Sequence, residues 1–184
     1  MNISNLDLNY ASILGISCFC SSSLKGTIAF GATQIFLNNK YSEYELIPKL
    51  TKLKNKVSKL ICDKSFDDLS ATTKKICNLL FAGSSFFLGV VAYRSFLPFI
   101  PSNLLLRELS LSASYFGITK VFNISMQHLI PLNEKLELRN MVSNFVSIPL
   151  MVFIPNPIIS SMISITITQI AYRVFEHLSN ESKQ

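Results

Sequence analysis

ICNLLFAGSSFFLGVVAY, residues 76–93, is a run of 18 residues without a charged side chain. Lys74-Lys75 precede it and Arg94 follows it. A helix needs about 20 apolar residues to cross a bilayer, and flanking basic side chains can reach the headgroups. Upstream, Ser65-Phe66-Asp67-Asp68 indicates a helix start, because a hydroxyl cap and acids suit the first turn. The run therefore predicts a transmembrane helix.

The composition of the whole chain favours lipid as its solvent. Of 184 residues, 49% are hydrophobic and 15% are charged, and the mean hydropathy is +0.37. A typical soluble domain has about 25% charged residues. A chain so poor in charge must cover its surface with a partner or with lipid, and lipid is the simpler explanation. We expect an all-α, polytopic helical membrane protein with about four transmembrane helices.

Residues 1–38 form an N-terminal apolar segment that is either one span or a hairpin. Tyr10–Leu37 is apolar except for Lys25. A single tilted span would place Lys25 near mid-depth, where it could line a pathway or pair with an acid. A hairpin turning at 24–26 would have arms shorter than the ~20 residues that a span needs. We favour the single span, which places the amino end outside the cell.

Residues 39–75 carry a lysine excess and predict a basic amphipathic helix between the first two spans. Its lysine face could attach to an anionic membrane surface, at about 1 kcal/mol per well-placed lysine. Alternatively, the helix covers the rest of the protein and its lysines are solvated. The lysine excess places this segment on the cytoplasmic side. Leu46, Ile47, Leu50, Leu53, Val57, Leu60 and Ile61 face one way on a helical wheel, and Lys49, Lys52, Lys56 and Lys59 face the other.

Residues 76–178 form the expected helical membrane domain, followed by a polar tail at 179–184. Pro98 and Pro101 end the helix that contains residues 76–93. The remaining expected elements are an apolar helix over Leu104–Ile130, a polar connector at 132–139, a short or re-entrant helix over Met141–Ile154 and a final span over Ile158–Leu178.

Two short segments alternate with period two, as strands do. They are Leu109–Ser112 and Ile163–Thr168. A membrane barrel would need such alternation in many segments of about ten residues. Serine and threonine are also tolerated in membrane helices, where they bond to their own backbone. Helices are therefore the favoured interpretation.

Two rows of small residues at helical spacing predict close helix packing in lipid. Through these rows the chain could pack its own helices, bind a protein partner or form a homo-oligomer. The first row is Gly15, Cys18, Ser22 and Gly26, and the second is Ser110, Ala113, Ser114 and Gly117.

The sequence shows no motif typical of catalysis or metal binding. His128 and His177 belong to no metal-ligand spacing, and the pair Cys18 and Cys20 has no second half. No glycine-rich phosphate loop or nucleophile elbow is present. We therefore expect no enzyme, no cofactor and no metal. The chain also lacks a basic face interleaved with aromatic residues, so we expect no nucleic-acid partner.

The expected function is that of a non-enzymatic, multi-pass integral membrane protein. It would act by helix packing, by membrane attachment (to anionic lipids among others) or by partner binding. A small transporter or channel is an alternative, indicated by Lys25. A secreted effector that inserts into host membranes and a soluble helical domain are the other two alternatives.

Overall fold

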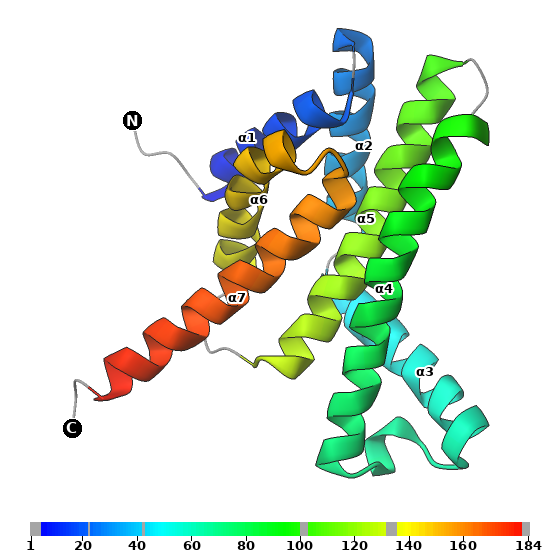
Figure 1. Cartoon of the computed structure of the whole chain (residues 1–184), viewed down its shortest axis with the longest axis vertical. Coiled ribbons are helices and arrows are strands. Elements are labelled where there is room, and N and C mark those ends of the chain that lie inside the picture. Colours follow the sequence, from blue (N-terminus) through cyan, green and yellow to red (C-terminus); the bar gives the residue numbers. More distant parts are fainter. Residues whose placement is uncertain (1–4, 22, 42, 100–102, 132–135, 182–184) are drawn as a thin grey trace.

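The computed structural model describes residues 5–21, 23–41, 43–99, 103–131 and 136–181, and every regular element in these ranges is helical (Figure 1). The all-helical prediction is confirmed there, and both alternating segments lie inside helices. In chain order the elements are α1 (Asn5–Cys20), α2 (Leu24–Lys40), α3 (Glu43–Cys62), the 3₁₀ turn η1 (Phe66–Asp68), α4 (Ala71–Phe99), α5 (Leu104–Leu129), α6 (Leu136–Phe153) and α7 (Pro157–Glu181).

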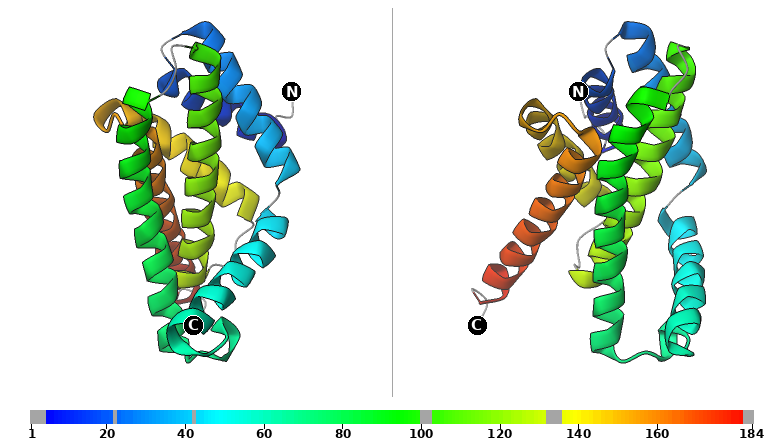
Figure 2. Two further views of the ribbon diagram at one scale, coloured as in Figure 1. Left: turned by 90° about the vertical axis from the view of Figure 1, so that its right-hand side faces the viewer. Right: turned by 45° about the vertical axis from the view of Figure 1, so that its right-hand side comes forward.

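α5 is the central helix of the bundle. It runs antiparallel to α4, and it also contacts α2, α3 and α7. α6 packs on α7 and on α1, and α1 packs on α2. α3 leans away from the bundle as an arm that η1 joins to α4 (Figure 2). Because α3 has few neighbours, more of its surface is available for other contacts.

The N-terminal apolar segment is two helices, so the preference for one uninterrupted span is wrong. α1 ends at Cys20 and α2 begins at Leu24. Ser23 is extended, and its Oγ accepts a hydrogen bond from the Gly26 amide at 3.1 Å. A serine in this position satisfies an amide that the first turn leaves without a helical partner. The hairpin alternative is the one that the structure shows, with its turn slightly earlier in the chain than expected.

The expected helix start at Ser65 is also wrong. Phe66–Asp68 forms the separate turn η1, and Ser65 makes no capping bond. α4 begins at Ala71, and Ser70 Oγ accepts a hydrogen bond from the Thr73 amide at 3.2 Å. Ser70 therefore provides the cap that was expected of Ser65.

The later helices lie close to the expected ranges. α5 and α7 cover nearly all of Leu104–Ile130 and Ile158–Leu178. α6 is a short helix, as expected, but it begins at Leu136, so part of the expected connector is helical. The remainder of that connector, 132–135, lies outside the described residues, as does 182–184 of the expected tail.

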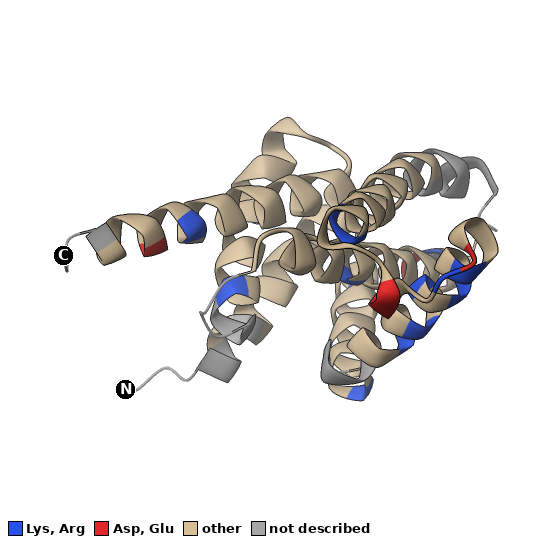
Figure 3. Cartoon of the chain, turned by 90° about the horizontal axis from the view of Figure 1, so that it is seen from below, with Lys and Arg blue, Asp and Glu red and all other residues tan. Residues whose placement is uncertain are grey.

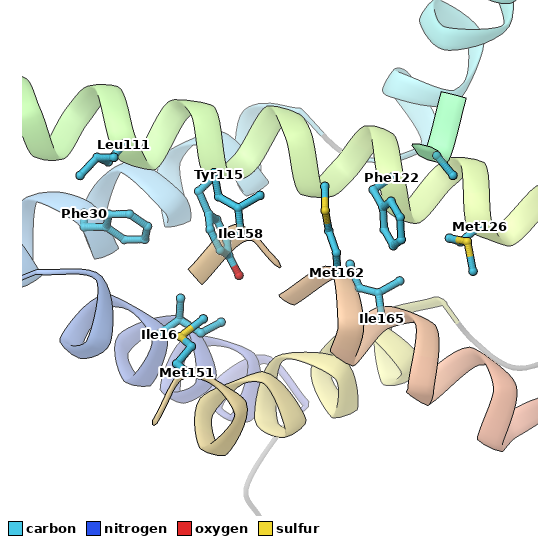
Figure 4. Packing of buried hydrophobic residues seen from close by; sticks show 11 residues of the cluster. Ile16, Phe30, Leu111, Tyr115, Phe122, Met126, Met151, Ile158, Met162 and Ile165 are labelled. Carbon is cyan, nitrogen blue, oxygen red and sulfur yellow. The ribbon is translucent and has the colours of Figure 1, made fainter. Parts of the chain in front are cut away.

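The hydrophobic core joins six of the helices around Met162, which is fully buried. Figure 4 shows its side chains between α5 and the helices opposite. Phe30 and Tyr115 meet edge to face, with ring centroids 5.7 Å apart. The cluster consists of Ile16, Phe30, Ala82, Leu111, Tyr115, Phe122, Met126, Met151, Ile158, Met162 and Ile165.

Burial in the bundle is inverted relative to a water-soluble domain. In the described part of the chain, 20 polar or charged residues are buried, against 17 apolar ones. Large apolar side chains are exposed on all seven α-helices, among them Phe87, Phe153 and Phe175. In water, a domain of this size normally buries its leucines and phenylalanines and exposes its polar side chains.

Candidate functional site

The lysine face of α3 is solvent-exposed. Lys49, Lys52, Lys56 and Lys59 are all exposed and lie along one side of the helix. Figure 3 shows that lysine and arginine residues gather on this arm. The structure thus brings the four predicted lysines together as one positive face.

The apolar side of α3 is only partly covered. Leu50 is buried against the bundle, but Leu53, Leu60 and Ile61 are exposed, Leu60 to 87%. On the helix, Leu53 and Leu60 lie between the buried side and the lysines. An exposed apolar strip beside a basic face is the pattern of helices that lie in the membrane interface.

Lys54 is the residue on this helix that sequence analysis missed. It is only 2% exposed, and its Nζ donates to Asn78 Oδ1 at 2.6 Å. The Nζ also lies 5.5 Å from the ring centroid of Phe66 and 5.6 Å from that of Phe81. Burial lowers the pKa of Lys54 to about 8. The sequence did carry a signal for this burial, because on the helical wheel Lys54 lies on the side of the apolar residues and not with the other four lysines.

Further polar contacts fix the corner between α3 and α4. Asn55 Nδ2 donates to Asp67 Oδ2 at 3.1 Å, and Ser65 Oγ donates to Asn55 Oδ1 at 3.1 Å. Ser58 Oγ donates to the Lys64 carbonyl at 2.7 Å. These bonds hold α3 by its C-terminal end, so its lysine face has a defined direction.

A second candidate site is a row of polar side chains on the inner face of α5. Glu108, Ser112, Tyr115, Thr119 and Asn123 are all buried. Their spacings of four, three, four and four residues place them on one face of the helix. At 1.5 Å per residue, the row extends over roughly 22 Å.

Neighbouring helices bond to the middle of this row. Gln34 Nε2 of α2 donates to the Ser112 carbonyl at 2.6 Å and to its Oγ at 2.8 Å. The hydroxyls of Tyr115 and Ser161 of α7 lie 2.6 Å apart. In a low-dielectric interior such bonds matter mainly because an unpaired polar group there is costly.

Asn123 joins three helices and borders a central cavity. Its Nδ2 donates to Asn140 Oδ1 of α6 at 2.9 Å, and its Oδ1 accepts from Gln169 Nε2 of α7 at 3.2 Å. The cavity has a volume of about 80 Å³ and lies mainly among polar side chains, Asn38 and Asn144 included. It is large enough for a few water molecules or one small polar solute.

Glu108 lies at the α1–α2 end of the row. It is 2% exposed, and its Oε2 has no hydrogen-bond partner. A Cβ atom placed on Gly26 would lie 3.1 Å from its Oε1, so glycine allows this close approach. Buried carboxylates are rare unless they are paired. Glu108 is therefore a second polar position in the interior, at the opposite end of the row from Asn123.

The first small-residue row is divided by the turn between α1 and α2. A Cβ on Gly15 would lie 2.7 Å from Ile148 Cδ1, so Gly15 packs directly against α6. Cys18 is exposed, Gly26 lies in the next helix, and Ser22 lies outside the described residues. The four positions therefore do not share one helix face.

The second small-residue row faces away from the core. Ala113 and Gly117 are exposed, and Ser110 and Ser114 are half-buried. A Cβ on Gly117 would meet no atom within 4 Å. The role of these residues in packing against another chain stays a prediction.

Lys25 is exposed in the first turn of α2, at the end of the α1–α2 hairpin. It lies outside the buried polar row. Its role as a pathway or pairing charge stays a prediction.

The described residues contain no cluster of three or more His, Cys, Asp or Glu side chains that could hold a metal ion. All four cysteines are free thiols. His128 Nδ1 lies 2.7 Å from the Ile124 carbonyl, one turn earlier in its own helix.

Two helical segments, Ala71–Val91 and Pro157–Asn180, are long and apolar enough to cross a membrane. In an apolar stretch of 18 residues within each segment, only 22% and 39% of the residues are buried inside the molecule, so neither is a shielded core helix. Comparison with protein-family models, curated proteins and solved structures gives no match.

Proposed function

We propose that the chain is a non-enzymatic, multi-pass integral membrane protein that uses α3 to attach to an anionic cytoplasmic membrane surface. The observation that carries the proposal is the inverted burial of the bundle, with polar side chains inside and large apolar ones outside. Hydrocarbon makes this arrangement favourable, because apolar side chains then face an apolar solvent and polar groups bond to each other.

The helix lengths support three full spans. α4, α5 and α7 have 29, 26 and 25 residues. At 1.5 Å per residue each exceeds the roughly 30 Å of hydrocarbon. We propose α5 as the third span, beside α4 and α7. The shorter α1–α2 hairpin and α6 would complete the membrane domain, in place of the fourth span expected for residues 10–37.

This topology revises the orientation of the amino end. Because α1 and α2 form a hairpin, the start of α1 and the basic α3 lie on the same side of the membrane. The lysine excess assigns that side to the cytoplasm. A tag attached at residue 1 should therefore be protected from protease in intact cells and digested after permeabilisation.

Carbonate extraction tests membrane insertion. We expect alkaline carbonate to leave the protein in the membrane pellet and detergent to release it. Release by carbonate alone would contradict the proposal and favour a soluble helical domain.

The attachment of α3 can be tested with a fluorophore on Cys62, which is exposed at the end of α3. With the other cysteines replaced, the labelled protein is placed in nanodiscs of neutral or partly anionic lipid. We expect a larger blue shift with anionic lipid, because the lysines hold the adjacent apolar strip in the interface. Changing Lys49, Lys52, Lys56 and Lys59 to glutamine should abolish this difference.

Lys64 and Lys75, which are exposed outside α3, provide the matched control. Their double glutamine variant lowers the positive charge at the same end of the molecule, and it should retain most of the shift. A quadruple α3 variant with an unchanged shift would leave α3 only a packing role.

A small transporter or channel is the second candidate function, favoured by the buried polar row on α5 and the cavity at Asn123. Reconstituted protein should then release small ions from liposomes, and Asn123→Leu should reduce the rate by blocking the cavity. Liposomes that stay as tight as protein-free ones would exclude this function.

A further inference from the structure

The end of the polar interior opposite Glu108 contains an arginine, Arg139, that pairs with no carboxylate among the described residues. Arg139, in the first turn of α6, is 8% exposed. Its Nε and Nη1 atoms are buried and have no hydrogen-bond partner, and among the described residues no carboxylate pairs with it. Arginine keeps its positive charge in proteins, and a buried charge without a partner strongly destabilises the folded state.

Arg139 borders a small cavity that collects other unpartnered groups. The cavity has a volume of about 10 Å³ and lies between α5, α6 and α7. Gln127 and Thr168 also border it, and neither Gln127 Nε2 nor Thr168 Oγ1 has a hydrogen-bond partner. Two guanidinium N–H groups, an amide N–H and a hydroxyl are thus available around one small space.

The unpartnered hydrogen-bond donors around this cavity outnumber the unpartnered acceptors, which indicates an anion. The cavity also has one unpartnered acceptor, Gln169 Oε1, which can take one of the guanidinium N–H groups. The other donors still lack an acceptor, and no carboxylate among the described residues offsets the charge of Arg139. A water molecule could accept two of these bonds but would leave the charge unpaired, whereas a small anion satisfies both requirements.

The size of the cavity limits the anion. A volume of about 10 Å³ holds one water-sized particle, and chloride is somewhat larger than water, so the ion would also occupy part of the adjoining space. The larger central cavity adjoins it, since Asn123 and Asn140 line both. We propose that Arg139, Gln127 and Thr168 bind one small inorganic anion of the size of chloride at the α5–α6–α7 junction. This site is separate from the lysine face of α3.

The stability of the purified full-length protein in detergent tests this proposal. Tm is measured by circular dichroism while sodium gluconate is replaced by sodium chloride at constant ionic strength. Gluconate is too large for the cavity. We expect Tm to rise by a few degrees and to saturate with chloride, as binding to the folded state alone requires. Broadening of the ³⁵Cl resonance by the protein should follow the same concentration dependence.

Variants distinguish a specific site from a general effect of salt. Arg139→Gln should lose the chloride dependence of Tm and the line broadening. Arg173→Gln, which removes an arginine that is 61% exposed and paired with Glu176, should keep both. If Arg173→Gln loses the response or Arg139→Gln keeps it, the proposal is wrong.

Gln127→Glu tests the site even if Arg139→Gln does not fold. The new carboxylate has almost the shape of the glutamine and lies at the cavity that the guanidinium borders, so it should replace the anion. We expect a higher Tm in gluconate than that of the natural protein, and no further rise with chloride. A Gln127→Glu protein with the natural chloride response, or natural protein without any chloride response, would overturn the assignment.

Discussion

Replacing Lys54 with methionine tests whether a buried amine controls the docking of α3. In the folded protein the Nζ has one hydrogen bond, to Asn78, and lies near two phenylalanine rings. Burial lowers the pKa of Lys54 from 10.5 to about 8. Folding therefore disfavours the charged amine, and methionine keeps the length of the side chain without the charge.

The direction of the pH dependence follows from this lowered pKa. Between about pH 8 and pH 10.5 the unfolded chain holds a proton on Lys54 that the folded chain has released, so stability rises with pH in this window. Below about pH 8 the full destabilisation is present. One pKa unit corresponds to 1.36 kcal/mol, so Lys54 by itself should stabilise the folded state by about 2 to 3 kcal/mol between pH 7 and pH 10.

Thermal unfolding in detergent at pH 7, 8.5 and 10 measures this effect. For a chain of this size, about 2 to 3 kcal/mol corresponds to a rise in Tm on the order of 5 to 10 °C. Lys54→Met should show little of the rise, and it should be the more stable protein at pH 7. Lys52→Met, an exposed lysine of the same helix, should behave as the natural protein does. Equal pH dependence in all three proteins would refute the buried-amine explanation.

Two further predictions concern packing and are measured by the same unfolding assay. A Cβ on Gly89 would lie 2.8 Å from Ile158 Cγ2, whereas one on Gly83 would meet no atom within 4 Å. Gly89→Val should therefore lower the free energy of unfolding by about 1–3 kcal/mol more than Gly83→Val does. An equal loss in both variants would contradict the contact between α4 and α7. Met162 is 0% exposed and Ile167 of the same helix is 48% exposed. Met162→Ala should therefore lower the free energy of unfolding by about 2–5 kcal/mol, and Ile167→Ala by much less. The reverse order would contradict the placement of Met162 in the core.

The ranges expected for α5 and α7 were close to the observed ones, and the starts of both helices also carry local signals that agree with them. Asn103 Oδ1 accepts from the Leu105 amide, and Asn156 Oδ1 accepts from the amides of Ile158 and Ile159. Asn156 comes directly before an uncharged run that extends to Tyr172, whereas the stretch after Asn103 is apolar but contains Arg107, Glu108 and Lys120. In these places the local preference and the hydrophobic pattern agree.

The break between α1 and α2 was missed because its signal is ambiguous. Ser21-Ser22-Ser23 contains neither glycine nor proline, and a serine inside a helix can bond to its own backbone, as Ser17 Oγ does to the Ile13 carbonyl. The same residue type also caps helices, which is what Ser23 does here. Only the packing of α1 against α2 and α6 decides between the two uses.

The buried polar row was missed for a different reason. From the sequence, Ser112 was considered only as part of the alternating segment Leu109–Ser112. It was not connected with the other polar residues that repeat at helical spacing, which are Glu108, Tyr115, Thr119 and Asn123. That spacing identifies one face of α5 but not the direction in which it points. The bonds from Gln34 and Ser161 assign it to the interior.

The distribution of exposed apolar side chains favours lipid over a single protein partner as the proposed covering of this bundle. A standard partner interface covers about 800 Å² of each protein, which is roughly one-fourteenth of the 11179 Å² accessible here. Exposed large apolar residues occur on all seven helices, for example Leu14 on α1, Phe87 on α4 and Phe153 on α6. A single partner would leave most of them in water, whereas lipid contacts every side of a spanning bundle. The proposed lipid environment would also account for the buried polar row, because side chains that cannot face hydrocarbon have only the interior in which to form hydrogen bonds.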